Sequence, residues 1–544
     1  MCKGCALTNI KRTQRMNRKT ILTIVIFGIL LTSCSRQSLM KIITKTPKID
    51  YKNIEGFKSF SDYHKDAIYA VNVIKETYPR LYQKVPDFDK KSNQFIKTSS
   101  KIKNEKQFDI ELKKFISILK DGHSNFSINF SKYDKTKYGL YIFKEKENWI
   151  IGNIDKEIDS VVIGKKIVSI NNIPIKEIEQ RIISFESGEN KYWKYKQFLY
   201  HYKFPTYWEA LKVISPQNTD LNFIVENKEG ISKFILKDKE KREGYKLEKK
   251  KSKYPYRNKQ NNGFYDTIFK SEKIAYIQMN TSLDYVSIKS EINNYTNFIT
   301  RPIALSFLKK DKKDARNFGE FLQSFFKRIQ EENIESLIID LSYNTGGDER
   351  TGKQLIWYLT EKQPKGFTEY INNSEYFKVQ IKEDYRKYNE LYKLKFQTDL
   401  PRGEVNITKK LFDEPYFNDI TKEKSPFLLD NTIPKFKGKI YVIISPKTFS
   451  AGQVLATTIA DNKLAIIIGK STGNKPTSQT GASMFKLPNT KKIIAISYTY
   501  MERPDKTKNN EKALYPNIEI NNTFKDFLNG NDRIMEYILN ENQK

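Results

Sequence analysis

The sequence predicts a multi-domain α/β protein, and three observations support this prediction. The chain has 544 residues, which at roughly 150 residues per domain gives about three to four domains. From Lys273 onward, apolar strands alternate with amphipathic helices, as in a largely parallel α/β sheet. Before that point, a region with helical spacing is followed by short β-type runs. Because 38% of the residues are hydrophobic, we expect a folded chain.

The composition restricts the classes of partner and cofactor. The chain has 96 basic and 64 acidic residues. Taken alone, this excess of positive charge suggests a nucleic-acid partner, an anionic membrane or acidic substrates. The lysines are spread along the chain, with no arginine-rich arm and no nucleic-acid-binding motif, so we expect no nucleic-acid partner. The only cysteines are Cys2, Cys5 and Cys34, and there are three histidines. We therefore expect no disulfide framework, no metal site and no cofactor.

The N-terminus has the features of a targeting segment. From a start at Met16, a basic pair precedes an apolar run over 21–31, which is too short to span a bilayer. Leu31-Thr32-Ser33-Cys34 resembles the lipobox of bacterial lipoproteins, which implies a signal peptide over 1–33 and a lipid on Cys34. By the same resemblance, Ser35 favours the periplasmic face of the outer membrane. A plain signal peptide or a buried helix is the alternative.

The region before the α/β part divides into three segments. Residues 35–135 are predicted as a tether and a helical domain, with helices over 61–78, capped by Ser61, and 105–119. Residues 136–240 are predicted as a β-rich domain. Its string over 164–172 resembles the PDZ-domain core, which makes 138–142 the carboxylate-binding loop. Lys165 and Asn172 depart from that pattern, so we expect weak peptide-tail binding, and a β-rich spacer is the alternative. Residues 241–270 are predicted as a charged linker, with an anionic-partner site as the rival interpretation.

The predicted α/β domain covers 271–524, and a C-terminal helix is predicted over 525–544. An insertion over 361–435 interrupts the alternation and is expected near the functional edge of the sheet, where it would cap a cleft. The elements expected around it are strands over 274–279, 337–341, 440–444, 465–468 and 492–499, and helices over 318–329 and 451–460.

Ser450 is the candidate nucleophile. It lies between a buried strand and a helix, where backbone N–H groups and the helix dipole stabilise a negative charge. Serine is also a common helix N-cap, so a purely structural role is the alternative. A serine nucleophile needs a base, and Lys475 follows it by 25 residues.

Two strings carry a family resemblance. Gly469 to Gln479 is similar to the lysine-containing segment of the C-terminal processing, or tail-specific, serine peptidases. Asp340-Leu341-Ser342-Tyr343-Asn344-Thr345-Gly346-Gly347 resembles the glycine turn of that family. The resemblance covers about 273–520 and implies a crotonase/ClpP-like core. It also implies a Ser450–Lys475 dyad, Gln479 orienting the lysine, and an oxyanion hole from Ala451 with Gly346 or Gly347.

Several positions depart from the family pattern and leave alternatives open. Ser342 replaces an arginine, Gln453 a glutamate, Asn474 a glycine and Pro476 a glycine. Asp121-Gly122-His123-Ser124 resembles the segment that ends the helical region of relatives, and His123 is a rival base, as in tricorn-type peptidases. The sequence therefore predicts a lipid-anchored envelope endopeptidase acting on proteins or peptides near their C-termini. The alternative is a non-catalytic lipoprotein of the same fold that binds peptide or another ligand.

Overall fold

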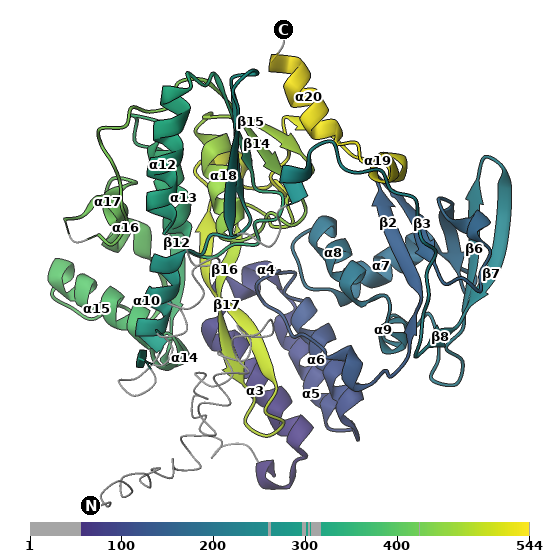
Figure 1. The fold of residues 1–544 in the computed structure, drawn as a ribbon. Coiled ribbons are helices and arrows are strands. Elements are labelled where there is room, and N and C mark those ends of the chain that lie inside the picture. Colours follow the sequence, from purple (N-terminus) through teal and green to yellow (C-terminus); the bar gives the residue numbers. More distant parts are fainter. Residues whose placement is uncertain are drawn as a thin grey trace, which may run out of the picture.

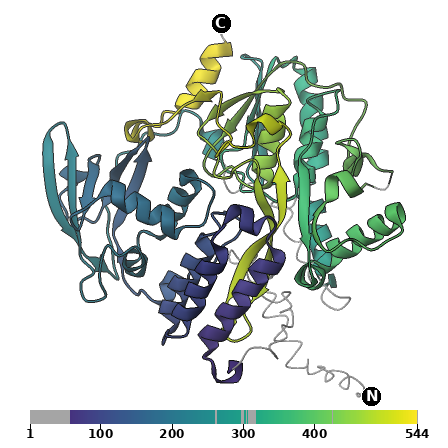
Figure 2. The same cartoon turned by 180° about the vertical axis from the view of Figure 1, so that it is seen from behind.

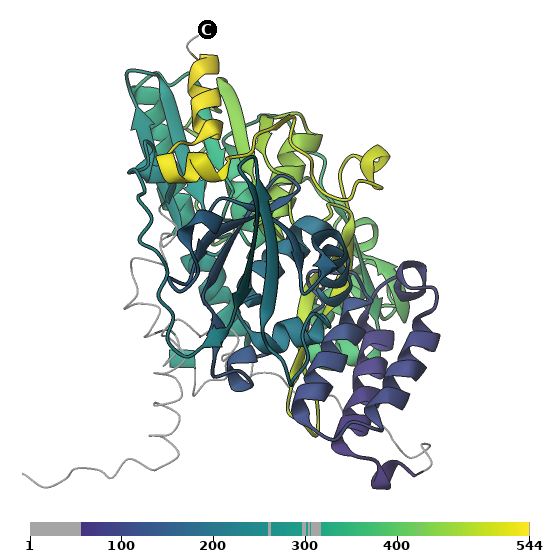
Figure 3. The ribbon, with the colours of Figure 1, turned by 90° about the vertical axis from the view of Figure 1, so that its right-hand side faces the viewer.

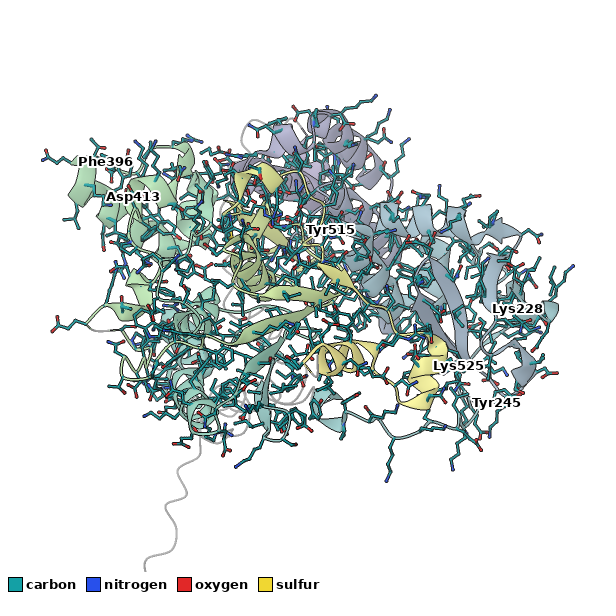
Figure 4. The ribbon with its side chains drawn as sticks, turned by 90° about the horizontal axis from the view of Figure 1, so that it is seen from above. Lys228, Tyr245, Phe396, Asp413, Tyr515 and Lys525 are labelled. Carbon is teal, nitrogen blue, oxygen red and sulfur yellow. The ribbon has the colours of Figure 1, made fainter. Side chains whose placement is uncertain are left out.

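The computed structural model describes residues 56–258, 263–295, 301–302, 305, 317–423 and 425–542. In Figure 1 the N-terminal helices lie below an α/β core, the β-rich region lies to one side, and the insertion lies to the other. Lys228, between β6 and β7, and Phe396 of α15 are labelled at opposite ends of the molecule in Figure 4. The predicted signal peptide and Cys34 lie outside the described residues. No helix that the structure describes is long and apolar enough to cross a membrane.

The N-terminal region is helical, as predicted, but contains more helices than the two expected. Ser61 caps the first helix by accepting a hydrogen bond from His64 N, and Asn104 caps the last through Gln107 N. The apolar faces of these helices share one core with the Phe485 and Ile494 side chains of the distant C-terminal hairpin. The helices are α3 (Asp62–Thr77), α4 (Leu81–Lys84), α5 (Phe88–Ser99) and α6 (Glu105–Ser117).

The β-rich region forms an antiparallel sheet of order β2-β3-β4-β6-β7, with β5 paired to β4. The aromatic stretch over 192–208 folds as two helices that pack on this sheet. The strands are β2 (Leu140–Glu145), β3 (Asn148–Ile154), β4 (Lys166–Ile170), β5 (Ile173–Pro174), β6 (Leu221–Asn227) and β7 (Gly230–Leu236). The helices are α7 (Ile175–Phe185), α8 (Lys191–His201) and α9 (Pro205–Ala210), and the short strands β1 (Lys137–Tyr138) and β8 (Asp238–Lys239) pair with each other.

The α/β core is a sheet of order β18-β15-β14-β11-β10-β9, parallel except for the β9–β10 pair. Helices α12, α13 and α18 cover one face and α20 covers the other. The strands are β9 (Phe264–Phe269), β10 (Ile274–Met279), β11 (Ser336–Asp340), β14 (Lys439–Ile444), β15 (Ile466–Gly469) and β18 (Ile518–Glu519). The helices are α10 (Tyr285–Tyr295), α12 (Phe318–Glu331), α13 (Glu349–Trp357) and α18 (Ala451–Asp461). The predicted parallel α/β sheet is confirmed.

The insertion folds as part of a second sheet. Its strand β12 pairs with β17, which gives the order β13-β12-β17-β16, and its helices enclose a separate apolar core. The β16–β17 hairpin runs from this sheet to the N-terminal helices (Figure 2). The elements are β12 (Thr368–Asn373), α14 (Glu375–Gln380), α15 (Lys382–Phe396), β13 (Gly403–Asn406), α16 (Ile407–Leu411), α17 (Asn418–Thr421), β16 (Ser478–Lys486) and β17 (Ile493–Glu502).

Two boundaries predicted from the sequence are corrected. The charged linker predicted over 241–270 includes strand β9, which pairs along its length with β10. The single helix predicted over 525–544 is two helices, α19 (Phe524–Asn529) and α20 (Arg533–Asn542) (Figure 3). The break falls at Gly530, whose φ is 68° and where an added Cβ would lie 2.4 Å from Lys251 O. Glycine ends α19 there because the linker backbone leaves no room for a side chain.

Candidate active site

Ser450 has a strained backbone at the start of α18. Its φ is 52° and its ψ is −127°, and its side chain makes no capping hydrogen bond. An ordinary N-cap serine has an extended backbone and accepts a hydrogen bond from the first turn, so Ser450 is not a capping residue. Such strain costs about 1–3 kcal/mol and is typical of functional sites. The geometry therefore favours the nucleophile interpretation over the structural one.

The glycine turn after β11 lies against Ser450. Gly346 has a φ of 110°, and an added Cβ there would lie 2.6 Å from Ser450 Cβ. Gly346 N donates to Asn344 Oδ1 at 2.9 Å, so this N–H is already occupied. The N–H groups of Gly347 and Ala451 make no hydrogen bond within the part of the chain that the structure describes. Of the three predicted oxyanion donors, Gly347 and Ala451 are therefore the ones available.

The linker supplies a guanidinium to this turn. Arg257 Nε donates to Asp340 Oδ2 at 2.9 Å, and its Nη2 donates to Ser342 Oγ at 3.1 Å. Asp340 is fully buried, and its other oxygen accepts from Ser342 N at 2.8 Å. Ser342 replaces the arginine of the resembling motif, and Arg257 brings an arginine to the same place from a distant part of the chain. Nothing in the sequence around Arg257 indicates this role.

Lys475 lies on the loop after β15, next to a residue that contacts the nucleophile. Burial lowers its pKa, Lys84 and Lys512 lower it further, and Glu189 opposes the shift. Its Nζ makes no hydrogen bond or ion pair within the described ranges. Asn474 Oδ1 accepts from Ser450 N at 3.2 Å, and Asn474 Nδ2 donates to Glu189 Oε1 at 3.2 Å. The departure from glycine at 474 thus adds a side chain that holds the Ser450 backbone.

The Gln479 side chain contacts a lysine other than the predicted one. Its Oε1 accepts from Lys84 Nζ at 2.8 Å, and its Nε2 donates to Pro79 O at 3.3 Å. Between Gln479 and Lys475 the described residues show no side-chain hydrogen bond. Lys84 lies on α4 and also lowers the pKa of Lys475. The predicted orientation of Lys475 by Gln479 is therefore not what the structure shows: Gln479 binds Lys84 instead.

His123 is buried beside the residue that precedes Ser450. Its ring packs on Phe449 at 4.5 Å between centroids, and its Nε2 lies 3.5 Å from Thr480 Oγ1. Burial lowers its pKa, an effect that Asp121 opposes, so the imidazole is neutral near pH 7. His123 is therefore brought near Ser450, as the rival interpretation requires.

Two acidic residues adjoin His123, and the sequence indicates only one of them. Asp121 accepts hydrogen bonds from His123 N at 2.9 Å and from Ser497 Oγ at 2.7 Å. Glu189, which no motif identifies, accepts from Gly122 N at 3.2 Å. Burial and the Asp121 carboxylate raise the pKa of Glu189 to about 8.

An aromatic stack fixes Phe449 from the β-rich region. Trp193 of α8 stacks on Phe449 with ring centroids 3.9 Å apart, and Lys196 Nζ lies 3.5 Å from the centre of the Trp193 ring. Burial and the nearby Lys447 lower the pKa of Lys196 to about 7. The aromatic helix α8 therefore reaches the candidate active site.

A cavity of about 660 Å³ lies away from Ser450, at the amino ends of β14 and β15. Tyr515, which lines it, is labelled in Figure 4. Ser450 follows the carboxyl end of β14, the edge at which ligand sites of open α/β sheets occur. The cavity is therefore not part of the candidate active site.

A strained residue at a helix N-terminus, beside two unoccupied N–H groups and two candidate bases whose pKa values are lowered by burial, is the arrangement of a hydrolytic enzyme. Residues 273–520 match the model of peptidase family S41. This match covers a little under half of the chain and supports a peptidase with a multi-domain α/β fold.

Solved structures share the multi-domain fold of this chain. One is the crystal structure of mature CPAF, 12% identical, with a TM-score of 0.54, covering 89% of this chain and 96% of that one. Another is mature CPAF complexed with lactacystin, 13% identical, with a TM-score of 0.52 and coverage of 89% and 97%. At this identity the likeness concerns the fold alone. No curated protein matches the chain.

Proposed function

We propose that the protein is a serine-type endopeptidase with Ser450 as its nucleophile. The observation that carries the proposal is the Ser450 backbone, which is strained, lacks a side-chain cap and lies against Gly346. This conformation places Oγ at the helix N-terminus and leaves the Ala451 and Gly347 N–H groups for an oxyanion. The match of residues 273–520 to peptidase family S41 supports the same chemistry.

In the proposed mechanism, Lys475 is the general base. Its lowered pKa supports a neutral amine, which takes the Ser450 Oγ proton as Oγ attacks the scissile carbonyl. The tetrahedral oxyanion accepts hydrogen bonds from the Ala451 and Gly347 N–H groups. Lys475 then gives the proton to the leaving amine, and an acyl-enzyme remains. Water, deprotonated by Lys475, hydrolyses this ester and regenerates Ser450.

His123 is the second candidate base. The observation that favours it is its position on Phe449, one residue before Ser450, together with a lowered pKa and the neighbouring Asp121. In that scheme the Asp121 carboxylate stabilises the imidazolium, as in serine–histidine–acid triads. Lys475 would then be a positioning residue.

Active-site labelling tests the nucleophile. A fluorophosphonate probe is expected to label the full chain, and Ser450→Ala should abolish both labelling and peptide cleavage. Ser471→Ala, a buried serine on a neighbouring loop, is the matched control and should keep both. Labelling that persists in Ser450→Ala would contradict the assignment and favour the non-catalytic alternative.

Separate variants identify the base. Lys475→Ala should lose nearly all activity, and the double variant with Ser450→Ala should lose little more, because the two residues act as one unit. Lys475→Arg should be equally inactive because a guanidinium stays charged. Activity retained in Lys475→Ala but lost in His123→Ala would instead assign the base to His123.

The substrates and the location are also proposals. We infer that the protein is anchored by a lipid on Cys34 and cleaves cell-envelope proteins or peptides near their C-termini. The lipobox-like Leu31-Thr32-Ser33-Cys34 supports the anchor, and family S41 supports the tail preference. Metabolic labelling with a fatty-acid analogue should be lost in Cys34→Ala, with release from the membrane fraction. Unchanged labelling would disprove the anchor.

A further inference from the structure

Three metal-ligating side chains converge beside the candidate active site. Asp121 and His123 follow α6, and Glu189 lies between α7 and α8. One ligand atom from each falls within 4.8 Å of the other two. Asp121 is fully buried, and the His123 side chain is 9% exposed. The cluster is therefore enclosed, unlike the acidic groups that are common on protein surfaces.

The imidazole of His123 has a free nitrogen in this cluster. Its Nδ1 is buried and has no hydrogen-bond partner in the described part of the chain. The nearest carboxylate oxygen, Asp121 Oδ1, lies 3.9 Å away, too far for a hydrogen bond. A buried nitrogen without a partner is costly, and most such groups in native proteins are satisfied by a neighbour, a water or an ion.

The two carboxylates are held in place by other contacts. Asp121 accepts hydrogen bonds from Ser124 Oγ at 2.6 Å and Ser497 Oγ at 2.7 Å. Glu189 accepts from Gly122 N and from Asn474 Nδ2, both at 3.2 Å. Outer contacts of this kind orient metal ligands and fix their geometry. The carboxylates are thus positioned by groups outside the cluster.

We propose that Asp121, His123 and Glu189 form a binding site for a divalent transition-metal ion of the Zn²⁺ type. One imidazole nitrogen and two carboxylates suit Zn²⁺ or Co²⁺, whose bonds to these donors are about 2.0–2.2 Å long. Ligand atoms of such a site lie about 3.4 Å apart, so the three ligand atoms of this cluster have to move slightly closer together when the ion binds. The ion would give Nδ1 a partner and compensate two adjacent carboxylates.

The site joins separate parts of the molecule and lies close to the nucleophile. It links the end of α6 to the β-rich region, and Asn474 connects Glu189 to Ser450 N. An imidazole that binds the ion cannot also accept the Ser450 proton, so the site is compatible with Lys475 as the base and not with His123. Binding of the ion does not itself require the peptidase chemistry. It can therefore be tested on an inactive enzyme.

Cobalt titration of the full-length Ser450→Ala protein tests the proposal. One equivalent of Co²⁺ is expected to give d–d absorption bands, which added Zn²⁺ should displace, and Zn²⁺ should raise the Tm. His123→Ala should abolish the bands, and Glu189→Gln should weaken binding by about 10-fold or more. His64→Ala is the matched control, since this half-buried ring is stacked on Phe60 and is not part of the cluster. It should bind as the parent does.

Three results would overturn the proposal. The first is the absence of Co²⁺ bands at sub-millimolar metal, and the second is equal binding in both cluster variants and the parent. The third is a strong thiolate-to-cobalt charge-transfer band, which would place the metal on Cys2, Cys5 or Cys34. If His123→Ala fails to fold, the isosteric Glu189→Gln decides the question through its affinity and its Tm response.

Discussion

At the scale of single residues, the contact between Ser450 and Gly346 leaves no space for a side chain at 346. An alanine Cβ there would lie 2.6 Å from Ser450 Cβ and 3.2 Å from Ala451 N. Both the nucleophile and the N-terminus of α18 would have to move. The turn is therefore a fixed surface against which Ser450 is positioned.

Gly346→Ala should reduce kcat/KM by at least about 100-fold, because small misplacement of reacting groups has effects of that size. Gly403→Ala is the control, since Gly403 also has a positive φ of 93° but no heavy atom within 4 Å of the added Cβ. Both variants should lose about 1–3 kcal/mol of unfolding free energy through backbone strain. Peptide-cleavage assays and urea unfolding measure the two quantities. Equal activity of the two variants would contradict the contact argument.

Lys475 makes both activity and stability increase with pH. Its folded-state pKa lies below the reference value of about 10.4. Between the folded-state pKa and the reference pKa, the folded protein therefore binds fewer protons than the unfolded chain. The contribution of Lys475 to stability therefore rises with pH across that window. As a base, it works only when neutral.

The pH profile of kcat/KM should rise to a plateau as Lys475 loses its proton. Lys475→Met should lose about 10²–10⁴-fold in activity. It should also raise the Tm at neutral pH, because a lysine whose pKa is lowered on folding destabilises the folded state there. Lys470→Met is the control: burial lowers that pKa too, so its Tm should rise while activity remains. If kcat/KM of Lys475→Met still rises with pH as it does in the parent, the titrating group is a residue other than Lys475.

At the scale of elements, the glycine turn depends on a residue from the linker. Arg257 binds Asp340 and Ser342 on the turn and also forms an ion pair with Asp532, near α20. Removing one partner of a buried ion pair leaves an uncompensated charge, which costs about 3–5 kcal/mol. The glycine turn and the segment before the C-terminal helix are thus held by the same guanidinium.

Arg257→Ala should lower the unfolding free energy by about 3–5 kcal/mol and reduce activity with it. Adding Ser342→Arg, which restores the arginine of the family motif, should recover part of both losses. Urea denaturation and peptide cleavage report the two effects. Parental stability of Arg257→Ala would show that Asp340 does not need a guanidinium partner. The same conclusion would follow if adding Ser342→Arg recovered neither stability nor activity.

The open edge of strand β2 is occupied by a side chain. Tyr202 Oη accepts from Ile142 N at 3.2 Å and donates to Leu140 O at 3.0 Å. A peptide that adds to a sheet edge needs these backbone groups. The prediction that the β-rich region binds peptide tails weakly thus has a structural basis, since Tyr202 competes for the same groups.

Tyr202→Phe should increase the affinity of the full chain for free C-terminal peptides, since it releases both backbone groups. It should also cost about 1–3 kcal/mol of stability, because these groups then lack a partner in the absence of peptide. Fluorescence polarisation with a labelled peptide library measures the first effect. Tight binding by the parent protein would show that Tyr202 does not block the edge.

At the scale of the whole molecule, the β16–β17 hairpin connects the catalytic core to the N-terminal helices. At its tip, Asn489 N and Thr490 N donate to the buried Asp66 of α3 at 3.0 and 2.6 Å. The same hairpin carries Gln479 and Thr480 at its base, beside Lys84 and His123. The helices are therefore part of the site's architecture.

Asp66→Ala should destabilise the protein by at least about 2 kcal/mol, because hydrogen bonds to a buried carboxylate are lost. Increased hydrogen exchange is expected both at the hairpin and in α3, with a smaller loss of activity. Asp62→Ala, on the same helix but exposed, is the control. Exchange that increases in α3 alone would show that the hairpin does not depend on this contact.

The sequence by itself determined the order of the elements and the location of the chemistry. Apolar runs fix β10, β11 and β14, because a buried parallel strand needs continuous hydrophobic residues. Ser450, Lys475 and the glycine turn lie in short local strings, so the resemblance of those strings to the tail-specific peptidases brings them to notice. His123 was found in the same way.

Only the tertiary structure decided which side chains complete the site. Arg257, Glu189, Trp193 and Lys84 reach it from segments that are remote along the chain, and no local pattern marks them. Gly346 N–H is occupied by Asn344, and Gln479 binds Lys84, because hydrogen bonds depend on distance and direction in space. The hydrophobic periodicity of a sequence indicates which face of a helix or strand is buried. The hydrogen-bond partners of a side chain depend instead on how elements that are distant along the chain pack together.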